Sequence, residues 1–264
     1  MEIFQYTFIQ NAIISGIFIG LLTAILGVFL VLKKLSLIGD GLSHLSFGAI
    51  AIGLFFGIYP LWIAIPIVIL ASLLIQFLIQ KSFLDGDSSI GIISAFGIST
   101  GVIFSSIGKG FNIDLFSYLF GNILTITRPE LFFSIILSVI ILSVIYLYYY
   151  DLLYITFDME QAKVSGVKVN LIQSILSILT AITIVLAIRM VGIMLVSALI
   201  IIPANTSLQI SSGFKQTLIN SGIISIFSIF IGILISFKFN LPSGATIIMV
   251  NLFLFVFSTI INRK

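Results

Sequence analysis

Long continuous runs of apolar residues, separated by short polar connections, dominate the pattern along this chain. The runs lie at roughly residues 7–32, 38–57, 60–80, 89–107, 130–150, 170–190, 192–210, 216–237 and 243–261. Most have about the 20 residues that a helix needs to cross a bilayer, and none alternates with the period of two that barrel strands show. The pattern predicts an all-α, polytopic transmembrane helical bundle with eight or nine spans, since Pro203 interrupts the run at 192–210.

The composition agrees with a membrane-embedded chain. Of its 264 residues, 60% are hydrophobic and 8% are charged, and the mean hydropathy is +1.32. Soluble domains carry about 25% charged residues, so this chain has too few to cover a surface that faces water. No stretch is polar enough to separate two folding units, and we expect residues 1–264 to form one transmembrane domain. Residues 1–5 lack a basic region, which argues against a cleavable signal peptide.

The sequence offers little from which to build an enzyme. It has no cysteine and one histidine, which excludes disulfides and thiolate metal sites and leaves no nucleophile–base arrangement. The Walker A pattern Gly-x-x-x-x-Gly-Lys-Ser/Thr does not occur, since Lys109 lies in Gly-Lys-Gly without the required spacing. We therefore expect a translocation protein without ATPase activity of its own and without a permanently bound cofactor.

Basic residues predict the orientation of the bundle, because cytoplasmic loops are enriched in lysine and arginine. If the loop after the first span is cytoplasmic, most of the 12 basic residues lie inside, namely Lys33, Lys34, Lys81, Lys163, Lys168, Lys215, Arg263 and Lys264. The N-terminus is then outside and the C-terminus inside. Among the outside cations, Arg189 lies near a span end from which it can reach lipid headgroups.

A further apolar stretch, at about 112–127, is short and interrupted by polar residues. It is too short for a span, and we expect a re-entrant or interfacial helix there. Asp114 and Glu130, at the edges of this region, are expected to be solvated loop ends.

Asp40 and His44 are the informative ionisable residues within the predicted spans. A charge at the middle of a bilayer costs at least about 2.5 kcal/mol, so such residues usually have a function. Four positions apart on a helix, the two side chains lie on one face. Carboxylate oxygen and imidazole nitrogen suit zinc or manganese rather than copper, and a twofold dimer would supply two such pairs, enough for a four-coordinate site. The alternative is that Asp40 only holds His44 in place within the core.

Residues 151–169 form the longest polar insertion in the chain, and the predicted orientation puts them in the cytoplasm. Thr156 or Asp158 can cap a short helix, Glu160 lies in its first turn, and Gly166 can end it. The sequence thus predicts a short cytoplasmic helix within about residues 156–168.

Phe157, Met159 and Ala162 would give this short helix an apolar surface outside the hydrocarbon. Such a surface suits docking into a groove of a partner protein. The alternative is an amphipathic helix that lies on the membrane surface.

Several segments resemble the membrane subunits of ABC-type importers of zinc and manganese. They lie at 26–34, 36–44, 118–122, 157–167, 191–199, 202–204 and 241–245, in the order and at the spacing of that family. Gly41, Leu45 and Asn205 depart from the alanines that the family often has there, which affects local packing rather than the class. The sequences at 43–48 and 118–121 are more similar to the zinc branch, and the proline that often follows the His in the manganese branch is absent.

The resemblance implies a homodimeric permease in the bacterial cytoplasmic (inner) membrane, surrounded by lipid. Cytoplasmic ATPase subunits would dock on it, and an extracytoplasmic metal-binding protein would deliver the ion; nucleic acid is not expected as a partner. Asp40 and His44 match the family's Gly-Asp-x-x-Ser-His type motif, which is implicated in handling the metal. The segment at 156–168 looks like the family's coupling helix, and the residues implied in coupling to the ATPase are Phe157, Asp158, Glu160, Gln161, Ala162 and Gly166.

Other functions stay open at this point. A manganese or iron importer of the same family would share every feature above. A secondary transporter can use an intramembrane Asp and His as a proton relay, although it would often show an inverted repeat, and no clear repeat is present. An ABC permease for siderophores or cobalamin would not require a metal-ligand pair in its spans.

Overall fold

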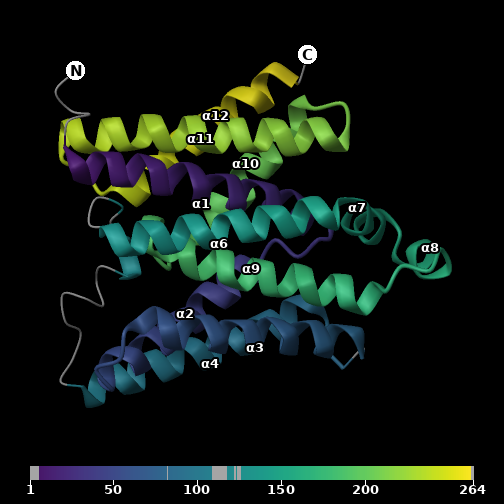
Figure 1. Cartoon of the computed structure of the whole chain (residues 1–264), viewed down its shortest axis with the longest axis horizontal. Coiled ribbons are helices and arrows are strands. Elements are labelled where there is room, and N and C mark those ends of the chain that lie inside the picture. The colour runs from purple at the N-terminus through teal and green to yellow at the C-terminus, as the bar shows by residue number, and fades with distance from the viewer. Residues whose placement is uncertain (1–5, 82, 109–117, 122, 124–125, 263–264) are drawn as a thin grey trace.

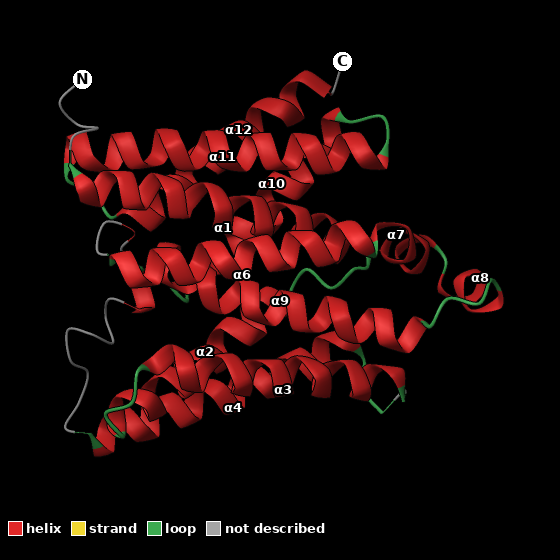
Figure 2. Cartoon of the chain, viewed as in Figure 1, coloured by secondary structure: helices red, strands yellow, loops and turns green. Residues whose placement is uncertain are grey.

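Each long apolar run folds as a helix, because a helix satisfies the backbone polar groups of a lipid-embedded segment internally. The structure, a computed structural model, describes residues 6–81, 83–108, 118–121, 123 and 126–262. In chain order the helices are α1 (Thr7–Leu32), α2 (Ile38–Phe55), α3 (Pro60–Gln80), α4 (Gly86–Ile107), α6 (Arg128–Leu147), α7 (Tyr149–Phe157), α8 (Met159–Val164), α9 (Val169–Val191), α10 (Val196–Ile210), α11 (Phe214–Phe239) and α12 (Ser243–Asn262). The described residues contain no strand (Figure 2), and the predicted all-α class is confirmed.

Among the described residues, eight helices are long and apolar enough to cross a membrane: α1, α2, α3, α4, α6, α9, α11 and α12. These helices run side by side along the long axis of the molecule (Figure 1). The chain is a multi-pass membrane protein, as its sequence predicts.

The ninth apolar run, at 192–210, forms a shorter helix. Gly192 has a φ of +85°, which ends α9, and α10 begins only at Val196 and has 15 residues. Pro203 lies inside α10 without ending it, so the interruption falls at Gly192. The Ser207 hydroxyl donates a 2.7 Å hydrogen bond to the Thr217 carbonyl oxygen in the first turns of α11, so α10 brings the chain to the end of the bundle where α11 starts.

The stretch predicted to be re-entrant, 112–127, lies largely outside the described residues. Of its described part, residues 118–120 form one helical turn that pairs with the turn between α9 and α10. The backbone N–H of Ile193 donates to the Tyr118 carbonyl oxygen at 3.0 Å. Gly121 and Gly192 approach so closely that a Cβ on Gly121 would lie 2.2 Å from the Gly192 nitrogen, so neither position accepts a side chain.

Helix α2 lies inside the bundle and packs against α3, α4, α9 and α10. It runs in the same direction as α4: Gly41 faces Ile90 near the start of both helices, and Phe55 contacts Phe104 near the end of both.

Helices α7 and α8 lie at one end of the bundle, and α8 projects beyond the ends of the long helices (Figure 1). We call this the α8 end. Helices α1 and α3 finish there and α9 begins there, so the connections that carry Lys33, Lys81 and Lys168 are at this end. That the α8 end faces the cytoplasm stays a prediction.

Candidate functional site

Asp40 and His44 lie on one face of α2, as their spacing predicts. Their Oδ2 and Nε2 atoms are 3.5 Å apart. Asp40 is in the first turn of α2, where the helix dipole stabilises a carboxylate. The Ser43 hydroxyl donates a 2.9 Å hydrogen bond to the main-chain carbonyl oxygen of Asp40, so this hydroxyl does not occupy the carboxylate. Both side chains therefore keep donor atoms available for a ligand.

The burial of α2 distinguishes this pair from its neighbours. Between Ile38 and Ala51, Asp40 and His44 are the two residues that are not buried. The Asp40 side chain is 46% exposed and that of His44 is 23% exposed. An Asp that only held a core His in place would be covered by the surrounding helices. This pair is instead partly exposed within the buried stretch from Ile38 to Ala51.

Glycines on both α2 and α4 allow the two helices to pack closely beside the pair. A Cβ on Gly97 would lie 2.3 Å from the Cα of Leu45, and one on Gly41 would lie 2.5 Å from the Ile90 side chain. Gly97 and Gly101 have the small-x-x-x-small spacing that lets membrane helices approach closely. The backbone of α2 is thus supported at the turn that carries His44.

The pair alone cannot complete a coordination sphere. Within the part of the chain that the structure describes, no group of three or more His, Cys, Asp and Glu side chains is placed to hold one ion. Zinc in proteins takes four ligands. Any ion at Asp40 and His44 would need further donors from water or from a second chain.

The predicted short helix is α8, and its boundaries follow from two residues. The Asp158 Oδ1 accepts a 2.9 Å hydrogen bond from the Gln161 N–H, so Asp158 is the N-cap. Thr156, the other predicted cap, instead donates to the Leu152 carbonyl oxygen within α7. Gly166 follows the helix with a φ of +88°, a conformation that strains any residue with a Cβ.

The surface of α8 differs in part from the prediction. Met159 is 41% exposed, and Val164, which the sequence did not single out, is 89% exposed. Glu160 and Gln161 are exposed beside them. Ala162 is fully buried, so the prediction that it adds to an exposed apolar surface is wrong. On α8 itself, the exposed apolar side chains are those of Met159 and Val164.

Phe157 joins this segment to the bundle. Its side chain is 65% exposed, yet its ring packs edge-on against Phe214 at 5.7 Å between centroids. Phe214 opens α11 and also contacts Phe29 of α1, at 5.4 Å, and Tyr149 of α7, at 6.0 Å. Phe157 therefore contacts α11 directly and is linked to α1 through the ring of Phe214.

A second connection runs from α8 through glutamines on α3 and α9, which we call the glutamine clasp (Gln76, Gln80 and Gln173). The Gln173 amide donates to the Met159 sulfur at 3.2 Å, and the Gln80 amide donates to the Gln173 carbonyl oxygen. Ser177 of α9 donates to the Gln76 carbonyl oxygen at 3.0 Å. The apolar pattern did not predict this clasp, although glutamines stand out within apolar runs of the sequence.

The far end of the bundle holds an ion pair that the sequence did not predict. The Arg189 guanidinium donates to Glu130 Oε1 at 2.7 Å, and the same oxygen accepts a 2.6 Å hydrogen bond from the Tyr59 hydroxyl. Burial and this hydrogen bond raise the pKa of Tyr59. Arg189 also lies over the Tyr118 ring, 4.9 Å from its centroid. Arg189 therefore binds protein groups rather than lipid headgroups, and Glu130 is not a solvated loop end.

Comparison with known proteins places this bundle in a family. The chain matches the model of the ABC 3 transport family over residues 5–262. It belongs to that family. It is 32% identical over 251 residues to the "Manganese transport system membrane protein MntC" of Listeria monocytogenes, which covers 95% of this chain and 89% of the relative.

Another ABC 3 relative carries a different metal in its name. The chain is 32% identical over 247 residues to the "High-affinity zinc uptake system membrane protein ZnuB" of Haemophilus influenzae, covering 94% of this chain and 95% of the relative. Among solved structures, "PsaBC from Streptococcus pneumoniae in complex with Fab" superposes with a TM-score of 0.87 and 30% identity, over 97% of this chain and 92% of that chain. The chain is thus an ABC transporter permease, and its relatives are named for both manganese and zinc.

Proposed function

We propose that this chain is the membrane-spanning permease subunit of an ATP-driven importer of a divalent transition metal, and that the metal is zinc. The observation that carries the proposal is the Asp40–His44 pair. The Asp40 Oδ2 and His44 Nε2 atoms are 3.5 Å apart, and these two residues are the ones that are not buried between Ile38 and Ala51 of α2. Ionisable side chains within spans are costly and usually mark the path of a substrate.

A second copy of the chain supplies the remaining ligands in this proposal. With a twofold axis along the path, each protomer contributes one carboxylate oxygen and one imidazole nitrogen. Two oxygens and two nitrogens match the four-coordinate geometry that zinc prefers. The ion is the cargo, so Asp40 and His44 replace part of its hydration shell during passage.

Manganese is the second candidate, because the relatives named for manganese are as similar to this chain as the relative named for zinc. Manganese accepts carboxylate and imidazole ligands but prefers six of them, with more oxygen. Two Asp–His pairs with added waters would satisfy it. The choice between the two metals therefore depends on how much water the ion keeps.

The energy for import comes from an ATPase subunit that docks on α8. Met159 and Val164 offer an apolar contact outside the span, as a partner groove requires. The contacts of Phe157 with Phe214, and of Met159 with the glutamine clasp, carry the motion of α8 into α1, α3, α9 and α11. A metal-binding protein delivers the ion at the opposite end, and the ion leaves at the α8 end.

The test is uptake of radioactive zinc and manganese into proteoliposomes that contain the chain with its ATPase and its metal-binding protein. Wild type is compared with His44→Ala and Asp40→Asn. Asp87→Asn is the matched control, because Asp87 occupies the first turn of α4 as Asp40 occupies that of α2. We expect ATP-dependent zinc uptake that both site variants abolish and the control retains.

Each other outcome corrects a specific part of the proposal. Preferential uptake of manganese keeps the site and changes the metal. Full activity of His44→Ala in an assembled complex removes the site. Uptake without the ATPase would identify a secondary transporter that uses the pair as a proton relay.

A further inference from the structure

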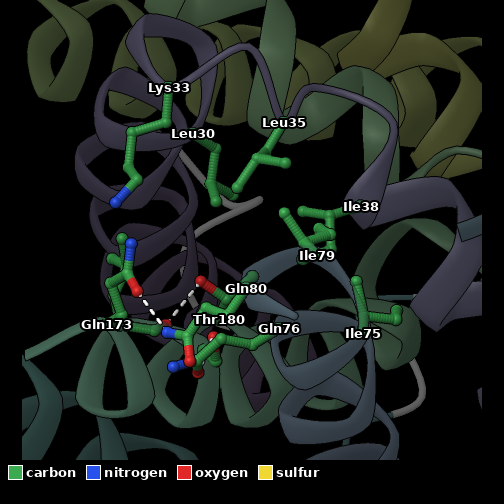
Figure 3. A pocket seen from close by; sticks show the side chains of 12 residues that line it. Leu30, Lys33, Leu35, Ile38, Ile75, Gln76, Ile79, Gln80, Gln173 and Thr180 are labelled. Carbon is green, nitrogen blue, oxygen red and sulfur yellow. Dashed lines mark hydrogen bonds between the residues drawn. The ribbon is translucent and has the colours of Figure 1, made fainter. Parts of the chain in front are cut away.

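A cavity separate from the Asp40–His44 site lies at the α8 end, between α1, α3 and α9 (Figure 3). Its volume is about 70 Å³, roughly that of a small polyatomic group. Leu30, Ile75 and Leu176 form its apolar wall, and the glutamine clasp borders it on the polar side. The cavity is therefore amphipathic, with one charged group among its lining side chains.

That charged group is the Lys33 ammonium. Its Nζ atom is buried and has no hydrogen-bond partner, and neither of the two salt bridges among the described residues includes it. A buried charge is costly unless it is paired, and an ammonium has three N–H donors to satisfy. Lys33 is thus a buried cation without a hydrogen-bond partner, and its side chain lines the cavity.

The polar groups nearby already bond to one another. The Gln80 amide donates to Gln173, and Ser177 donates to Gln76, as Figure 3 shows in part by dashed lines. None of these groups carries a negative charge. An anion with several acceptor oxygens would supply Lys33 with both an opposite charge and hydrogen-bond acceptors.

The surroundings favour an anion as well. Gln80 and Gln173 also line a second cavity, of about 630 Å³, under α8. The charged residues that line this second cavity are Lys163, Lys168 and Glu160. Cations outnumber carboxylates around this second cavity.

We propose that the Lys33 cavity binds the phosphate group of an anionic phospholipid from the leaflet at the α8 end. The apolar wall accommodates the carbon atoms next to the phosphate of a lipid. A free phosphate ion has no such carbon atoms and would leave this wall without an apolar partner. Basic cavities between spanning helices are suited to anionic lipid headgroups. Because Leu35 and Ile38 also line the cavity, the bound lipid braces the segment that leads into Asp40.

The experiment measures the thermal unfolding midpoint of the purified, delipidated chain in detergent. Phosphatidylglycerol, phosphatidylcholine and sodium phosphate are added separately at equal concentration. We expect phosphatidylglycerol to raise the midpoint by about 3 °C more than phosphatidylcholine, and native mass spectrometry to find it retained on the chain. Lys33→Met removes the difference between the lipids. Lys81→Met, which removes an exposed cation at the same end, preserves it.

Several results would overturn the proposal. If both lipids raised the unfolding midpoint of the wild type equally, the site would be excluded. This comparison uses the wild type alone, so it does not depend on the folding of Lys33→Met. Equal loss of the difference in Lys81→Met would indicate diffuse surface attraction. If sodium phosphate raised the unfolding midpoint as much as phosphatidylglycerol does, the ligand would be a free ion rather than a lipid. Lys33→Arg keeps the charge, so loss of the lipid preference in this variant would also contradict the proposal.

Discussion

Gly97 of α4 lies directly against the backbone of His44 in α2. A Cβ at position 97 would be 2.7 Å from the His44 carbonyl oxygen and 2.3 Å from the Cα of Leu45. Real atoms do not approach this closely, so α4 reaches the turn that carries His44 because residue 97 has no side chain. The position of the His44 imidazole therefore depends on a glycine, which has no side chain that could bind a metal.

Gly97→Ala is expected to push α2 away from α4. Overpacking of a close contact costs about 1–3 kcal/mol, which corresponds to a midpoint lower by about 2–4 °C per kcal/mol. Because the displaced turn carries His44, metal uptake should fall more than the stability loss explains. Both quantities are measured on the same preparation, by thermal unfolding and by uptake into proteoliposomes.

Gly91→Ala provides the control, since a Cβ at Gly91 would meet nothing within 4 Å. Alanine is the better helix former by about 1 kcal/mol, so this variant should be as stable as wild type or more so. Equal behaviour of the two alanine variants would contradict the role given to the Gly97 contact.

The sequence predicts most of the bundle and the Asp40–His44 pair because both depend on local order. Span positions follow from runs of apolar residues, and a spacing of four puts two side chains on one helix face. The contact between Gly97 and His44 does not follow, because it joins two helices whose packing is not encoded in either helix alone. Asp158 as the cap of α8 was predictable, whereas the burial of Ala162 depends on the packing of α8 against the rest of the molecule.

Pairs distant in the sequence were missed for the same reason. Glu130 and Arg189 are 59 positions apart, and each was expected to face water or lipid when considered alone. The shorter helix at 192–210 was attributed to Pro203, whereas the backbone turns at Gly192. A proline inside a span is tolerated where neighbouring groups satisfy the freed carbonyl.

Arg189→Met is expected to destabilise the end of the bundle opposite to α8. Breaking a buried pair by removing one partner costs about 3–5 kcal/mol. The Arg189 and Glu130 side chains are 20% and 14% exposed, so we expect a smaller loss, of about 2 kcal/mol. Arg128→Met removes an exposed arginine nearby and should cost little. The measurement is the thermal unfolding midpoint of both variants. Equal midpoints would show that the Arg189–Glu130 ion pair adds no stability.

Val164→Asp is expected to weaken binding of the ATPase subunit. Val164 is 89% exposed on α8, so the substitution leaves the fold intact but introduces a charge into the proposed contact. Loss of one such contact corresponds to at least about tenfold in affinity. The measurement is the amount of ATPase that copurifies with the permease. Leu241→Asp, an exposed apolar position after α11, should leave copurification unchanged, and an unaffected Val164→Asp complex would exclude α8 as the docking site.

The stability of the delipidated chain is expected to rise with pH between about 8 and 10 because of Lys33. Burial lowers the pKa of Lys33 from 10.5 to about 8, so the folded state disfavours the proton that the unfolded chain still binds. The contribution of Lys33 to the free energy of unfolding is therefore fully present above the unfolded pKa of 10.5, and it is lost as the pH falls through the folded pKa of about 8. Its full size is about 3 kcal/mol. Wild type and Lys81→Met should gain midpoint temperature over this range relative to Lys33→Met, in which no ammonium is buried at this position. Parallel midpoints for all three proteins would show that the Lys33 ammonium is solvated in the folded state.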